Sequence, residues 1–159
     1  MTPREAAAAL LDAMPTGPSL SQLEEYGIEA TAERARAIAR ELLSLNLFWI
    51  FSAIEAHIPA KFQPAVSELV LKTMESGWGT SYPVGAVAWT AFLAEWKERT
   101  QRYERFVREG LSPLAVTAES GLFLEERQVV TEEERRNVLT LLIDFVPVEA
   151  YGQLLQDVH

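Results

Sequence analysis

The side chains that most often carry out chemistry in proteins are scarce in this sequence. It has no cysteine and two histidines, His57 and His159. Glu55 and His57 stand two residues apart, so on a helix they point about 200° away from each other and do not share a metal ion. The sequence also lacks a Gly-x-Ser-x-Gly motif and the glycine-rich loops that hold phosphates. We therefore expect no metal site and no cofactor, and a non-enzymatic protein rather than an enzyme. An enzyme that uses carboxylates and arginine without a metal is the alternative with the least support.

Four aromatic residues form the first candidate binding site. Trp89, Phe92 and Trp96 recur at helical spacing, and Trp49 lies on a second long predicted helix. Such rings either line a cavity between helices or fill a core, and their spacing suits both roles. A void among the four would favour a pocket for a small apolar ligand. A filled core with an exposed apolar patch would favour a protein partner.

The second candidate is the glycine-rich loop at residues 77–83. Its glycines permit close approach of a ligand, Thr80 and Ser81 supply hydrogen-bond donors, and the start of the next helix favours anions. In the alternative interpretation the loop only connects two helices. Ser81 then caps the second helix, and Trp78 and Tyr82 pack at the corner.

The third candidate is an acidic surface towards the C-terminus. The net charge is −9, and −6 of it arises between residues 119 and 159, from nine acidic and three basic residues. This charge argues against binding to nucleic acids or anionic membranes and favours a basic protein partner. In the alternative interpretation, the three consecutive acids only stabilise the start of a helix. The residues of the predicted surface are Glu125, Glu126, Glu132, Glu133, Glu134 and Asp144.

The elements that must position these residues are all helices. Residues 2–5 and 131–134 both have the Thr-x-x-Glu pattern of a helix capping box. Prolines and glycines divide the chain into about six to seven helices. Two of them, at about 31–57 and 83–109, are long and similar in length, which predicts antiparallel packing at the centre of a bundle. The sequence therefore predicts one all-helical domain over residues 1–159.

The faces of the two long helices predict which side chains are buried. Glu41 lies opposite the apolar face of the first helix, and Glu95 belongs to a charged face of the second, so we expect both in solvent. Residues 42–54 are apolar nearly all round, which predicts a central helix. The second helix also carries an aromatic stripe from Trp89 to Phe106, which packs within the chain or against a second copy, and we favour a homodimer.

Composition and the chain's N-terminal residues suggest a cytoplasmic protein. The sequence is 48% hydrophobic and 23% charged, as in ordinary globular domains. The first residues lack the features of a secretory signal, and the apolar stretch is shorter than the roughly 20 residues of a membrane-spanning helix. The function we expect is a protein-interaction or regulatory module, such as an immunity-type protein or an assembly factor. The alternative is a sensor or carrier that holds a small apolar ligand between the long helices.

Overall fold

The computed structural model describes residues 1–159 and is helical throughout, without a strand. The prediction of an all-helical bundle is confirmed, although the helices are more numerous than expected. In chain order they are α1 (Pro3–Ala13), α2 (Leu20–Glu25), α3 (Ala32–His57), α4 (Gln63–Ser76), α5 (Trp78–Ser81), α6 (Trp89–Arg108), α7 (Pro113–Glu126), the 3-10 turn η1 (Glu132–Glu134), α8 (Arg135–Asp144) and α9 (Val148–Leu154).

Local sequence determines how several of these helices begin. The N–H of Glu5 donates to the hydroxyl of Thr2 at 3.2 Å, and the N–H of Thr2 donates to the carboxylate of Glu5 at 2.9 Å. The same reciprocal arrangement occurs at Ser19 and at Thr131. Each box satisfies two backbone N–H groups that a helix start otherwise leaves free. Both predicted capping boxes are therefore present.

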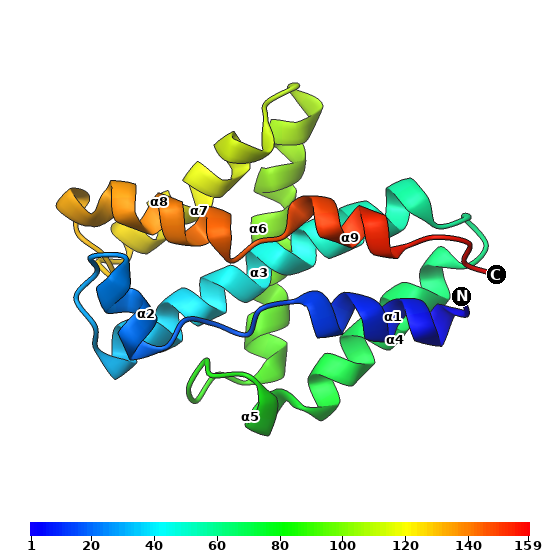
Figure 1. The fold of residues 1–159 in the computed structure, drawn as a ribbon, viewed down its shortest axis with the longest axis horizontal. Helices are drawn as coiled ribbons and strands as arrows, with labels where there is room; N and C mark the ends of the chain where they lie inside the picture. Colours follow the sequence, from blue (N-terminus) through cyan, green and yellow to red (C-terminus); the bar gives the residue numbers. More distant parts are fainter.

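Helix α3 runs through the middle of the molecule, with the other long helices around it (Figure 1). Leu43 and Leu47 belong to a core cluster shared with α1, α4, α6 and α9, whereas Leu42 and Leu45 belong to a second cluster shared with α2, α7 and α8. A helix that is apolar on all sides needs such neighbours all round. By length and composition α3 could span a membrane, and 67% of its most apolar 18-residue window is buried within this fold.

Helix α6 packs against α3 and crosses it (Figure 1). The rings of Phe48 and Tyr103 lie 5.3 Å apart, and those of Phe51 and Trp96 lie 5.0 Å apart. From the first pair to the second, the residue number rises along α3 and falls along α6. The two helices therefore run in opposite senses where they contact each other. Helix α4 contributes to the first core cluster and α7 to the second.

The start of α6 differs from the prediction. The sequence pattern placed it near residue 83, but the helix begins at Trp89. Gly85 adopts a positive φ of 80°, and the indole N–H of Trp78 donates to the carbonyl of Val87 at 2.6 Å. These two features hold the preceding segment outside the helix. The hydrogen bond to the Val87 carbonyl comes from a tryptophan side chain of another helix, so periodicity within α6 does not reveal it.

Candidate functional site

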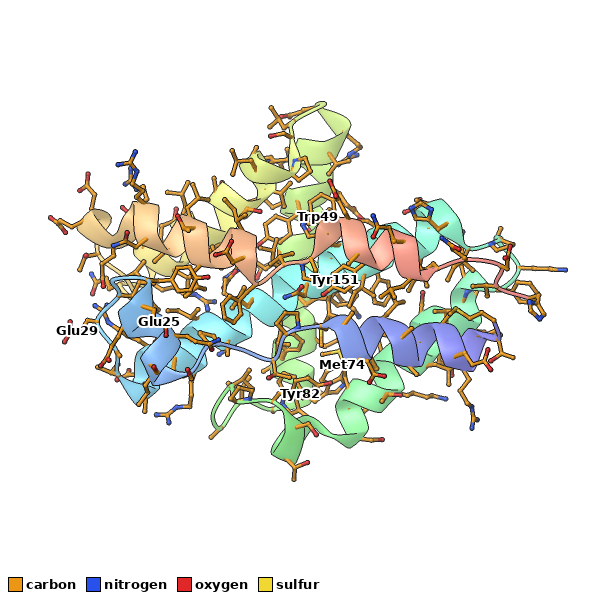
Figure 2. All side chains as sticks on the ribbon, viewed as in Figure 1. Glu25, Glu29, Trp49, Met74, Tyr82 and Tyr151 are labelled. Carbon is orange, nitrogen blue, oxygen red and sulfur yellow. The ribbon has the colours of Figure 1, made fainter.

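The four aromatic residues of the predicted pocket do not enclose one cavity. Trp89 and Phe92 stack on Trp78, with ring centroids 5.2 and 4.7 Å away. Trp96 lines a hollow with residues of α3 and α4, whereas Trp49, which lies beside α9 in Figure 2, lines a different hollow. Phe92 is completely buried in the core cluster that α3 shares with α1, α4, α6 and α9.

The loop candidate packs a corner of the fold. Trp78 is 8% exposed, and the ring of Tyr82 lies 5.5 Å from it. Thr80 and Ser81 are exposed and form part of the short helix α5. Ser81 does not cap α6, which begins eight residues later at Trp89. The rings of Trp78 and Tyr82 therefore contact each other, whereas the side chains of Thr80 and Ser81 lie in solvent.

Three of the six carboxylates in the predicted acidic surface bind other side chains of the same chain. Glu126, Glu132 and Glu133 are exposed and unpaired, whereas each of the other three carboxylates contacts a side chain of this chain. Glu25, at the end of α2, and Glu29, in the segment that follows it, lie at the same end of the molecule (Figure 2). Sequence reasoning missed these two because they lie far from α8 along the chain. The engaged pairs are Glu125 with Arg135 at 2.6 Å, Glu134 with Arg34 at 2.8 Å, and Asp144 with Tyr26 at 2.5 Å.

A groove runs along the crossing of α3 and α6. It consists of an inner hollow of about 400 Å³, which also touches α4, and an outer hollow of about 330 Å³. Phe48, Ser52, Glu55 and Glu104 line both hollows, so the two are continuous. The groove therefore combines an aromatic wall with two carboxylates, one from each long helix.

Two residues that line the inner hollow carry hydrogen-bonding groups without partners. Neither the indole N–H of Trp96 nor the hydroxyl of Thr100 has a hydrogen-bond partner in the protein. Both polar atoms are buried, so they are not exposed in the hollow itself. Buried donors of this kind usually have an acceptor. Among the predicted pocket residues, Trp96 is the one that belongs to this groove.

The carboxylates of the groove lack compensating charge. Glu55 and Glu104 are both exposed, and neither takes part in any of the ion pairs of the fold. The only basic side chain that lines the groove is Arg108, and it belongs to the outer hollow alone. The inner hollow is therefore acidic.

Beyond the outer hollow, the groove opens towards an exposed apolar corner. Val107, Leu111 and Leu114 follow one another from the last turn of α6 into α7, and they are 47%, 45% and 52% exposed. The α6–α7 corner projects from the rest of the molecule in Figure 1. We call Val107, Leu111 and Leu114 the apolar corner.

A buried charge network joins α3, α6 and the end of α7. Glu41 is 1% exposed and accepts a hydrogen bond from Arg99 at 2.8 Å. Glu95, 8% exposed, pairs with Arg40 and also accepts from Arg127 at 3.1 Å. The prediction that both carboxylates face solvent is wrong. Arg99 and Arg127 supply the cations that permit their burial, and α7 covers this side of the crossing.

This charge network is a structural junction. Burial raises the pKa of the Glu41 carboxyl, and the hydrogen bond from Arg99 and its charge act in the opposite direction. The guanidinium of Arg99 also stacks 3.7 Å above the ring of Phe123. None of the five main hollows is lined by Glu41, Glu95 or Arg99. Arg127 of the network lines a separate hollow, together with Arg34 and Gln128.

Comparison with known proteins identifies no relative of this chain. No family model matches the chain, and neither a curated protein nor a solved structure is significantly similar to it. The structure also has no cluster of three or more His, Asp or Glu side chains placed to hold a metal ion. A function for this chain must therefore be argued from its groove and its apolar corner.

Proposed function

We propose that this protein is a non-enzymatic interaction module that binds a protein partner across the groove and the apolar corner. The apolar corner is the observation that supports this proposal most strongly. Val107, Leu111 and Leu114 are about half exposed and lie outside the two buried core clusters. Grouped apolar side chains in solvent are typical of surfaces that another macromolecule covers.

The charge of the groove indicates the chemistry of the partner. Glu55 and Glu104 are unpaired, and the whole chain has a net charge of −9. A basic partner is attracted by this field and replaces the cations that the groove lacks. The proposal thus keeps the sequence-based expectation of a basic cytoplasmic partner, but places its contact surface on α3, α6 and α7.

The two competing proposals have less support. A carrier of a small apolar ligand would need an enclosed apolar cavity, whereas the inner hollow contains two carboxylates and opens into a second hollow. A homodimer would cover the apolar corner with a second copy of the same acidic chain. That arrangement would leave the charge of the groove uncompensated, although it stays open to test.

Site-specific photocrosslinking tests the proposed surface. A benzoylphenylalanine introduced at Leu114 is expected to crosslink one basic protein in cells of the source organism. The same probe at Ala65, which is exposed on α4, is expected to crosslink none. Replacement of Leu111 by Asp should abolish the Leu114 crosslink and leave the thermal midpoint unchanged, because Leu111 is 45% exposed.

Two results would contradict the proposal. Identical crosslinked products from Leu114 and Ala65 would show that the apolar corner has no selective partner. A product that contains only two copies of this chain, together with a dimer mass in light scattering, would show that the corner is a homodimer interface instead.

A further inference from the structure

We propose that the order of charges along α6 and α7 fixes the register between these two helices and keeps the apolar corner in solvent. This inference goes beyond the proposed function, because it concerns how the fold presents that surface. The two helices are joined by a line of polar and cation–ring contacts, which we call the polar line. Its residues are Glu95, Arg99 and Arg102 of α6, Glu119 and Phe123 of α7, and Arg127 directly after α7.

The polar line is continuous along both helices. On each helix its successive members are three or four residues apart, so they are neighbours on the helix surface. The residue number rises along α7 as it falls along α6, as in an antiparallel helix pair. The contacts are Arg102 to the carboxylate of Glu119 at 2.8 Å, the guanidinium of Arg99 to the centre of the Phe123 ring at 3.7 Å, and Arg127 to the carboxylate of Glu95 at 3.1 Å. Each contact joins unlike partners, so their order is specific to this register.

Apolar burial alone does not select this register. Val116 and Leu124 of α7 are buried, at 0% and 1% exposure. Leu114 and Leu122, two residues earlier, are 52% and 39% exposed and lie about 200° away around the helix. A shift of α7 by two residues would exchange the two pairs, and apolar side chains would still occupy both buried places. Another property of the sequence therefore keeps Leu114 in solvent.

The polar line opposes such a shift. The shift would bring Glu125 to the place of Arg127, opposite the carboxylate of Glu95. Because Glu95 is 8% exposed, a like charge beside it is costly, whereas Arg127 now supplies a cation there. The same shift would put Gly121 in the place of the Phe123 ring. The polar line thus favours the observed register, in which the apolar corner is exposed.

Exchange of two charges tests the inference. In Glu125→Arg with Arg127→Glu, the shifted register places the cation beside Glu95, so α7 should adopt that register. The chain has no cysteine, so nitroxide labels can be attached through Ala65→Cys on α4 and Glu126→Cys at the end of α7, both at exposed positions. A two-residue shift moves the label on α7 by about 3 Å along the helix and about 200° around it. Double electron–electron resonance should show one distance for the native sequence and a displaced one for the exchanged variant.

A matched control exchanges two charges outside the polar line. Lys97→Glu with Glu98→Lys keeps the net charge, and both side chains are exposed on α6. This control should keep the native distance. The native distance in the exchanged variant would overturn the inference. Equal displacement in the control would also overturn it, because the register would then not depend on the polar line.

A milder variant decides the question if the exchanged one does not fold, as judged by far-UV circular dichroism. Arg127→Met removes the cation beside Glu95 without adding a carboxylate. Both registers should then be populated, so the native and the displaced distance should appear together. A single native distance in folded Arg127→Met would overturn the inference.

The crosslink from Leu114 tests the proposed function separately. A selective crosslink in the native protein, together with unchanged distances in the exchanged variant, would support the interaction surface and overturn the inference about the register. Displaced distances in the exchanged variant, without a selective crosslink in the native protein, would support the inference and contradict the interaction surface.

Discussion

Helices α3 and α6 each contribute one carboxylate to the buried charge network and one to the groove. The surroundings of these two pairs of carboxylates differ. Glu41 of α3 and Glu95 of α6 are buried and contact arginines. Glu55 of α3 and Glu104 of α6 are exposed and form no ion pair, although Arg108 lines the outer hollow with them. The two pairs therefore have the same residue type and the same parent helices, but opposite environments.

The position of α7 accounts for this difference. It packs against α3 and α6 on the side of Glu41, and Arg127 at its end bonds to Glu95. A carboxylate covered in this way is costly unless a cation accompanies it, so the fold requires the arginines there. On the side of Glu55, α4 lines only the inner hollow, and both carboxylates of the groove stay exposed.

The comparison teaches which charges the chain needs for folding. At the buried junction, the ion pairs are part of the packing, and removing one partner should damage the fold. In the groove, the carboxylates have no role in packing that the structure reveals, so their charge is available to a partner. Three predictions follow this contrast from the largest expected effect to the smallest.

Replacement of Arg99 by Met should give the largest loss of stability. It leaves Glu41, which is 1% exposed, without its hydrogen-bonded cation. Leaving a buried charge unpaired typically costs about 3–5 kcal/mol, which we expect as the fall in the free energy of unfolding measured by urea titration. The control is Arg102→Met, which removes an exposed pair with Glu119 and should cost at most about 1 kcal/mol.

A second substitution tests whether the unpaired charge causes this loss. Glu41→Leu in the Arg99→Met background removes the stranded carboxylate and should recover most of the lost stability. If the double variant is as unstable as the single one, packing of Arg99 on Phe123 would be the dominant contribution instead. Pairing of the Glu41 charge would then contribute little to stability, and the contrast with the groove would fail.

Glu134 should give an intermediate effect that depends on pH. Partial burial raises the pKa of its carboxyl, but hydrogen bonds from the N–H groups of Glu29 and Thr131 and from Arg34 outweigh burial and lower it to about 2. The unfolded chain then binds more protons between pH 4.5 and 2, so this contribution to stability is complete above pH 4.5 and disappears towards pH 2.

Glu134→Gln should therefore lower the free energy of unfolding by about 2 kcal/mol at pH 7 and flatten its decrease between pH 4.5 and 2. Urea titrations at several pH values measure both effects. The neighbouring Glu133→Gln is the control, because that side chain is exposed and has no partner. If the free energy of unfolding falls equally between pH 4.5 and 2 in the two variants, the carboxylate of Glu134 does not stabilise the fold through its hydrogen bonds.

Local features of the fold could be predicted from the sequence, but the start of α6 could not. The hydroxyl of Thr2 and the carboxylate of Glu5 lie three residues apart, so the capping box needs no distant partner. The segment before Trp89 has helical periodicity, yet the bond from Trp78 to Val87 and the positive φ of Gly85 hold it in another conformation. Such tertiary contacts override a pattern that reports only local preference.

The candidate site was predicted less completely for a similar reason. Trp96 was identified from its spacing, and the structure places it in the groove. Periodicity assigned Glu41 and Glu95 to solvent because charged residues usually face water, but it does not indicate where a third helix packs. The sequence also gave no signal that Glu55 and Glu104 line one hollow, since they meet only through the crossing of α3 and α6.

The smallest effect is expected in the groove, and it sharpens the comparison most directly. Glu55 lies in the last turn of α3, where a negative charge interacts unfavourably with the helix dipole. Glu55→Gln should therefore raise the free energy of unfolding by about 0.3 kcal/mol, and Glu104→Gln should change it by less than about 0.5 kcal/mol. Glu95→Gln, measured beside them by urea titration, should instead destabilise the fold, because it removes the charge that Arg40 and Arg127 contact. A loss above about 1 kcal/mol in either groove variant would mean that the fold needs these carboxylates, and the distinction between the buried network and the groove would not hold.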